Sequence, residues 1–243
     1  MANEALLKEI RQIHEESHGC YGYPRVHAAL RQKGILCGRH RVAKIMRENN
    51  IIGKKAIKFK KHRHRHHLQQ NSQNLLLNRG PDTTKNQVWV GDITYIRIGQ
   101  EAAYLSVVMD RFTRKILGWT FAHRTGADLV TESMIMALNG QRPEKGLIFH
   151  SDQGVEYASN KFHQLLNERD IRISKSRKGH CWDNAYMESF FHSLKTEMIY
   201  FNQFHSLEEA TAYIIDYIYF YNHERIHSGI NYLTPLACEQ MAA

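Results

Sequence analysis

The chain has 243 residues, of which 42% are hydrophobic, and it carries a formal net charge of +9. This length allows one large domain, or a small domain followed by a medium one, with a buried core. There is no apolar run of about 18 residues and no secretory signal, so we expect neither a membrane span nor a membrane partner. The four cysteines are scattered without C-x-x-C spacing, which favours reduced thiols in a cytoplasmic protein over disulfides or a zinc site.

The positive charge is concentrated in residues 1–80, which carry a net +12, whereas residues 81–243 carry −3. Apolar residues at helical spacing predict helices over 3–16, from Pro24 to just before Gly34, and over 38–49. Three short helices with glycine-containing turns, the last one basic, fit a helix-turn-helix module. Such a module would contact DNA through Arg39, Arg41 and Lys44, and a small helical bundle with a solvated basic face is the alternative.

Residues 54–82 contain too few apolar side chains to build a core, so we predict a basic linker between a domain at 1–53 and another at 83–243. Its histidines could bind a metal ion. However, five lysines and two arginines within 54–67 would repel a cation, which favours contact with DNA phosphates. The lysines predicted to make these contacts are Lys54, Lys55, Lys58, Lys60 and Lys61.

The amino-acid composition changes after residue 87. From there, β-branched and aromatic residues predict three strands joined by short turns, an antiparallel meander over 88–98, 102–109 and 115–121. Two further strands are expected over 146–150 and 171–174. Helices are expected between and after them, over 127–138, 158–169, 183–200 and 206–222. A meander followed by α/β alternation predicts a mixed sheet with helices packed on it.

Three acidic residues stand out within this second part. Asp92 interrupts an apolar strand, where a charge must be paired, exposed at an edge or bound to metal. Asp152 follows the C-terminal end of a strand, where α/β sheets gather functional groups, although an Asx-type turn would also explain it. Glu188 lies on a predicted helix, where glutamate is ordinary. Together they match the oxygen ligands of Mg²⁺, and a pair of such ions can activate an attacking hydroxyl and stabilise a leaving oxygen.

Several motifs in a fixed order carry a family resemblance. They are WVGDITY at 89–95, HSDQG at 150–154, SRKGHCWDNA at 176–185 with ESFF at 188–191, and YNHERIH at 221–227. With the GYPRV segment at 22–26 and 35 residues between Asp152 and Glu188, they strongly resemble the DDE transposases of bacterial insertion sequences. The most similar type is the one encoded by the second reading frame (OrfB), which shares the retroviral-integrase core.

The resemblance implies an α/β, RNase H-like fold, with a five-stranded mixed sheet, helices on both faces and a small all-α helix-turn-helix domain in front. It implies that Asp92, Asp152 and Glu188 are catalytic and hold Mg²⁺ or Mn²⁺, as two ions. Water, and later a DNA 3′-hydroxyl, would attack phosphorus, giving DNA cleavage, strand transfer, integration and recombination. The implied partners are insertion-sequence ends, target DNA, further copies of the chain and an upstream first-frame protein, in a bacterial cytoplasm.

The same resemblance implies roles for residues around Glu188. Lys195 lies two helical turns after Glu188 on the same face, and it is predicted to touch terminal DNA rather than to be only a solvated lysine. Arg177, Lys178 and Gly179 resemble the mobile loop before the glutamate helix, and Arg177 and Lys178 are predicted to contact DNA. Capping of the 183–200 helix is the simple account of Asp183 and Asn184.

Two other functions remain as hypotheses. The chain starts directly before the helix-turn-helix, so it could be a second-frame product acting as a DNA-binding regulator with an inactive core. A ribonuclease H-type hydrolase would share the fold and prefer RNA–DNA hybrids.

Overall fold

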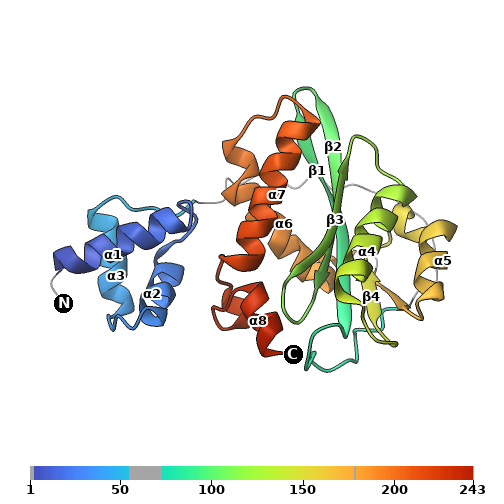
Figure 1. The fold of residues 1–243 in the computed structure, drawn as a ribbon, viewed down its shortest axis with the longest axis horizontal. Helices are drawn as coiled ribbons and strands as arrows, with labels where there is room; N and C mark the ends of the chain where they lie inside the picture. The colour runs from blue at the N-terminus through green and yellow to red at the C-terminus, as the bar shows by residue number, and fades with distance from the viewer. Residues whose placement is uncertain (1–2, 55–72, 178, 243) are drawn as a thin grey trace.

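The computed structural model describes residues 3–54, 73–177 and 179–242. Three helices at the N-terminus form one part, and a sheet with helices on both faces forms the other (Figure 1). No helix within the described ranges is both long and apolar enough to cross a membrane. The division at residues 53/54 and 82/83 stays a prediction.

The N-terminal part consists of α1 (Asn3–Glu16), α2 (Tyr23–Gln32) and α3 (Arg39–Glu48), as the apolar spacing predicts. Each helix buries residues three or four apart, for example Leu6 and Ile10 of α1. Pro24 lies in the first turn of α2, where its missing N–H costs no hydrogen bond. The basic side chains of α3 are left on the outer surface, so the predicted three-helix module is confirmed.

The sheet contains five strands among the described residues, in the order β3-β2-β1-β4-β5. Its first three strands form the expected antiparallel meander, whereas β4 is parallel to both β1 and β5. The strands are β1 (Val88–Ile98), β2 (Glu101–Asp110), β3 (Ile116–Ala122), β4 (Ile148–Ser151) and β5 (Arg172–Lys175).

Helices cover both faces of the sheet (Figure 1), and alternation along β1 supplies each face with apolar side chains. Trp89 packs into a core cluster with α4 and α5, whereas Val88 and Val90 belong to the cluster that contains α6 and α7. The helices are α4 (Ala127–Gln141), α5 (Asn160–Glu168), α6 (Ala185–Glu197), α7 (Leu207–His223) and α8 (Pro235–Met241). Short 3₁₀ turns lie at Val155–Ala158, Cys181–Asn184, Ile199–Phe201 and Ser228–Ile230. This is the mixed α/β architecture that the resemblance implies.

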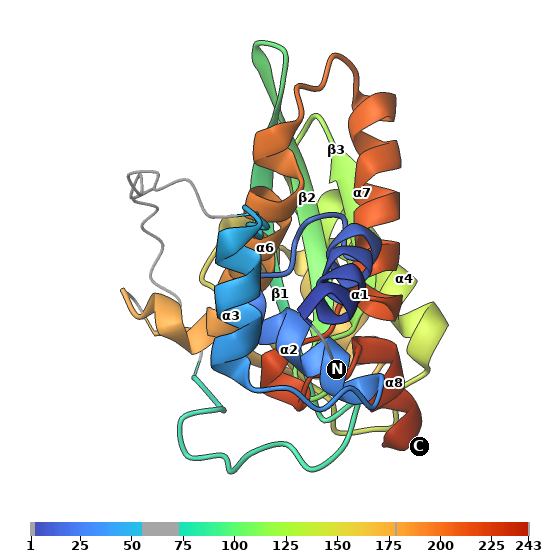
Figure 2. The ribbon, with the colours of Figure 1, turned by 90° about the vertical axis from the view of Figure 1, so that its left-hand side faces the viewer.

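The N-terminal helices lie on the α6–α7 side of the sheet, as Figure 2 shows from that side. The phenol of Tyr21 joins the two parts, since it donates to the Glu224 carbonyl at 3.2 Å and accepts from the Ile226 N–H at 2.8 Å. The Lys54 ammonium donates to the Glu197 carbonyl at 2.8 Å. The helical module is therefore connected directly to the end of α6 and to the segment after α7.

Candidate active site

Asp92 lies in the middle of β1, directly after a glycine that has no room for a side chain. A Cβ on Gly91 would lie 2.5 Å from Cζ of Phe149, so any larger residue there would have to displace the Phe149 ring. The carboxylate of Asp92 is half-buried and accepts a hydrogen bond from the Ile93 N–H at 2.8 Å. An acid is thereby held on a central strand of the sheet.

The parallel register of β1 and β4 brings Asp152 beside Asp92. Val90 pairs with His150, and each aspartate lies two residues further along its strand direction. Because neighbouring strands are about 4.8 Å apart, continuing this register brings the two acids side by side just beyond the C-terminal end of β4. The Gly154 N–H donates to Oδ1 of Asp152 at 2.9 Å, so the Asx-type turn expected as an alternative is present and orients the carboxylate.

Glu188 reaches the same region from the first turn of α6, where the helix dipole favours a negative charge. The start of α6 is tied to β1 by Asn184, whose buried amide donates to the Gly91 carbonyl at 3.0 Å. Asn184 occupies the N-cap position of α6, but neither its side chain nor that of Asp183 makes a capping hydrogen bond, so the capping interpretation is wrong. Asp183 instead accepts hydrogen bonds from the backbone and guanidinium of Arg177 and from Asn74.

Asp152 and Glu188 both act electrostatically on Asp92. Burial, together with the negative charges of Asp152 and Glu188, raises the pKa of Asp92 to about 8. The pKa of Asp152 is also raised, mainly by burial and further by Glu156, against the hydrogen bond from Gly154. Like charges gathered in this way are relieved by a bound cation, so the chemistry of the donor set fits a hard divalent ion.

Among the described residues, the three carboxylates do not form a preformed metal-binding cluster. Within the described ranges, no group of three or more His, Cys, Asp or Glu side chains lies close enough together to hold a metal ion. Glu188 is exposed, whereas Asp92 is held by the sheet. Completing a three-carboxylate site would therefore require these side chains to come closer together.

Lys195 faces this acidic region from α6. Its ammonium lies 5.3 Å from the centre of the Tyr95 ring. Burial lowers the pKa of Lys195, and the negative charge of Asp92 partly offsets that effect. The predicted position beside Glu188 is therefore consistent with the fold, while its contact with DNA stays a prediction. Arg177 is exposed and held by Asp183, and the neighbouring Lys178 lies outside the described residues.

The other predicted DNA contacts belong to α3 and the linker, which are distant in the sequence from the three acids. Arg39, Arg41 and Lys44 are exposed on α3, with local partners in Tyr23, Asn3 and Glu48 respectively. Lys54 is half-buried and engaged with the end of α6, as described above. The remaining linker lysines, Lys55, Lys58, Lys60 and Lys61, lie outside the described residues.

Sequence reasoning missed two groups behind Asp152. Lys175, the last residue of β5, is almost fully buried and pairs in register with Ser151, and its charge opposes the rise in the Asp152 pKa. The imidazole of His150 is buried between the hydroxyls of Ser174 and Ser176, at 2.8 and 3.0 Å. One sequence signal could have found Lys175: it follows a predicted strand, as Asp152 does.

Comparisons with known proteins agree with this architecture. An integrase core domain family matches residues 82–181, a second integrase core domain family matches 169–235, and an HTH-like domain family matches 1–59. A transposase for insertion sequence element IS904 of Lactococcus lactis is 37% identical, over 96% of this chain and 92% of its own length. Transposase InsF for insertion sequence IS3A of Escherichia coli is 38% identical, over 88% of this chain and 75% of its own length.

Solved structures resemble the chain in fold. The HTLV-2 integrase catalytic core domain, in complex with magnesium, has a TM-score of 0.51 at 14% identity and covers 65% of this chain and 99% of its own. A chain in the structure of the simian T-cell lymphotropic virus intasome, in complex with PP2A regulatory subunit B56 gamma, has a TM-score of 0.55 at 18% identity, over 87% of this chain and 73% of its own. At these identities the likeness concerns the fold alone.

Proposed function

Because this chain belongs to the insertion-sequence transposases with an integrase core domain, polynucleotidyl transferases that act in DNA transposition, we propose that it cuts insertion-sequence ends and joins them to target DNA. Asp92, Asp152 and Glu188 would be the catalytic residues and the metal ligands. The observation that carries the proposal is that the negative charges of Asp152, just after β4, and of Glu188, on α6, both raise the pKa of Asp92 on β1.

The proposed cofactor is Mg²⁺ or Mn²⁺, as two ions, which when bound would activate the attacking hydroxyl and stabilise the leaving oxygen. The residues of the chain contribute orientation and charge. The Gly154 N–H holds the Asp152 carboxylate in its turn, and the hydrogen bond from Asn184 to β1 fixes the start of the Glu188 helix. Lys195, on the same side, is suited to a DNA phosphate that approaches the acids.

DNA would be held by basic residues on both parts of the chain. We propose that α3 contacts DNA through Arg39, Arg41 and Lys44, and that Arg177, Lys178 and Lys195 contact it near the acids. The linker lysines 54, 55, 58, 60 and 61 would add phosphate contacts, for which Lys54 would have to leave the Glu197 carbonyl. Assembly of several copies on DNA is part of the proposal, and light scattering of the protein–DNA complex would measure it.

The test uses labelled candidate element ends, target DNA and Mg²⁺. Wild-type protein should cleave and join the ends, and Glu188→Gln should lose joining by several orders of magnitude while binding the ends with unchanged affinity. Glu132→Gln is the matched control, because Glu132 is an exposed glutamate on α4, on the opposite face of the sheet. Joining that proceeds equally well in excess EDTA, or in Glu188→Gln, would rule out the metal site.

The absence of a ready-made three-acid cluster in the described ranges favours one second candidate, a DNA-binding regulator with an inactive core. This function predicts salt-sensitive binding of the same ends. It also predicts that neither Mg²⁺ nor Mn²⁺ yields cleavage with wild-type protein, even when an upstream first-frame segment is added.

A further inference from the structure

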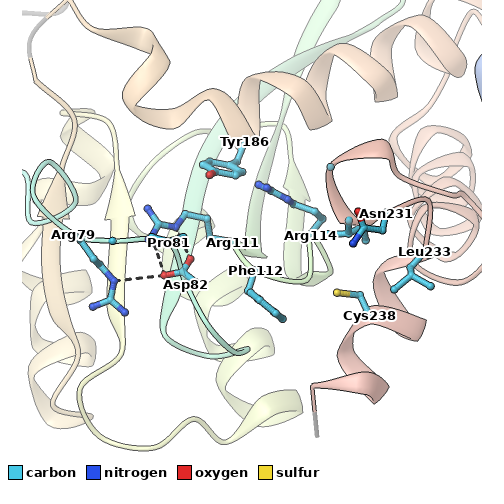
Figure 3. Close-up of a pocket in the computed structure, with 13 residues that line it drawn as sticks. Arg79, Pro81, Asp82, Arg111, Phe112, Arg114, Tyr186, Asn231, Leu233 and Cys238 are labelled. Atoms are coloured by element: carbon cyan, nitrogen blue, oxygen red, sulfur yellow. Dashed lines mark hydrogen bonds and ion pairs between the residues drawn. The ribbon is translucent and has the colours of Figure 1, made fainter.

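A cavity of about 440 Å³ lies away from the three acids, beside the turn that joins β2 to β3 (Figure 3). Its wall is built from segments far apart in the sequence. They are the stretch around Asp82, the β2–β3 turn with Arg111 and Arg114, Tyr186 at the start of α6, and the segment before α8. None of these residues belongs to the proposed metal site, which lies further along β1.

The cavity has more positive than negative charge on its wall. Three arginines face it, and its single acidic lining residue, Asp82, is buried and already paired. Arg111 holds Asp82 through two hydrogen bonds of 2.6 and 2.8 Å, and Arg79 approaches the same carboxylate at 3.5 Å. The nearby Asp110 accepts bonds from the Asn86 N–H and from Thr113. No carboxylate on this wall is left for the third arginine.

Arg114 is that third arginine. Its guanidinium carbon lies 3.9 Å from the centre of the Tyr186 ring, and its buried Nε has no hydrogen-bond partner in the part of the chain that the structure describes. Its side chain makes no ion pair there either. A guanidinium stacked on an aromatic ring keeps its edges available, and its planar fork of N–H donors matches the oxygens of a phosphate. Among the arginines of this cavity, Arg114 is the one that lacks an anion.

We propose that this cavity is a phosphate-binding site that holds one backbone phosphate of the DNA on which the enzyme acts, with Arg114 as its main ligand. The identity of the ligand as DNA rests on the proposed function. The phosphate would pair with the edge of the Arg114 guanidinium, as the Asp82 carboxylate pairs with Arg111. Arg79 and Arg111 would add long-range attraction without releasing Asp82.

The cavity has a rigid spacing to the acids. The backbone N–H of Arg111 donates to the Val88 carbonyl at 3.0 Å, which connects the cavity to β1. Asp92 lies four residues after Val88 on β1, about 13 Å from it. Tyr186, on which Arg114 stacks, lies two residues before Glu188 on α6. At 3.4 Å per base pair along one strand, 13 Å corresponds to about four base pairs. A phosphate held in this cavity would therefore set the register of the DNA strand that crosses the acids.

The test measures DNA binding in EDTA, so that it does not depend on catalysis. The dissociation constant of a labelled duplex carrying the candidate end is measured against salt for wild type, Arg114→Gln and Arg114→Lys. Loss of one phosphate contact should reduce the slope of log affinity against log salt by about 0.9 in Arg114→Gln. Affinity near 0.1 M salt should fall about tenfold. Arg114→Lys should restore the slope, because the charge is kept.

Arg169→Gln is the matched control, since Arg169 is an exposed arginine at the end of α5, and its slope should equal that of wild type. Circular dichroism confirms that each variant is folded. Ethylation interference on the wild-type protein does not depend on any variant. A single ethylated phosphate about four base pairs from the cleaved bond should block binding.

A wild-type slope in folded Arg114→Gln, or the absence of any interfering phosphate at that distance, would overturn the proposal. The proposal would also be overturned if inorganic pyrophosphate stabilised the fold of wild type but not of Arg114→Gln, while the salt slope of DNA binding stayed the same in both. That result would assign the cavity to a small free phosphate. If cleavage fails in every protein while the Arg114 dependence persists, the proposed function is wrong and the phosphate site stands.

Discussion

A buried ion pair between Arg225 and Glu197 should be the main electrostatic link between the end of α6 and the segment after α7. Arg225 is 1% exposed and donates two hydrogen bonds to the Glu197 carboxylate, at 2.7 and 2.6 Å, and one to the Ser193 hydroxyl at 3.1 Å. The Tyr217 hydroxyl donates to the same carboxylate at 2.9 Å, and Arg25 of α2 approaches it at 3.8 Å.

We expect Arg225→Met to reduce the free energy of unfolding by about 3–5 kcal/mol, because it leaves the Glu197 carboxylate buried with only Tyr217 and a distant Arg25. Glu197→Leu should cost a similar amount, because it leaves the Arg225 guanidinium uncompensated. Replacing both by Met and Leu should cost much less than the sum of the single changes, since apolar residues of similar volume often match a buried pair.

The assay is equilibrium urea unfolding followed by circular dichroism, with the four proteins of a double-mutant cycle measured in one buffer. The expected coupling energy is more than about 2 kcal/mol. Lys145→Met is a control for a surface pair, because Lys145 is 2.9 Å from Asp170 and both are exposed. It should change stability far less than Arg225→Met does, because water screens an exposed pair. Additive single changes, or an Arg225→Met cost no larger than the Lys145→Met cost, would refute the reasoning.

Two further predictions concern Gly91 and His227. Gly91→Ala should destabilise the fold by about 1–3 kcal/mol in urea unfolding, because its Cβ would lie 2.5 Å from the Phe149 ring, and Phe149→Leu should recover part of the loss. Gly140→Ala in α4, where a Cβ meets nothing within 4 Å, is the control and should be neutral or stabilising, and equal effects at both glycines would contradict the packing argument. Burial and then nearby arginines lower the pKa of His227 to about 4, so the folded protein takes up this proton later than the unfolded chain does. Its contribution to stability should be complete above about pH 6.5 and fall by up to about 3 kcal/mol as pH drops to 4, with no further change below, and His227→Gln should remove this part of the pH dependence of unfolding.

Much of the architecture follows from local patterns. The β-branched run over 88–98, the two strands after it and the short turns between them predict the meander correctly, because alternation and turn chemistry act within a few residues. The same patterns place Asp92 inside a strand and Asp152 just beyond one. Helix ends were less accurate, since the predicted 183–200 helix is divided into two 3₁₀ turns with α6 between them.

What only the tertiary structure decided are the contacts between segments that the sequence separates. Asn184 reads as a helix cap, yet it bonds to the backbone of β1, because the packing of α6 on the sheet offers a buried carbonyl there. Spacing along the chain also does not reveal that Arg225 meets Glu197, or that Arg114 stacks on Tyr186. Hydrophobic periodicity tells which face of a strand or helix is buried, but a buried charge takes its partner from whichever element folds against it. The sequence alone therefore determined the order of elements and their acids, and the three-dimensional packing determined which charges are paired and which are left for a ligand.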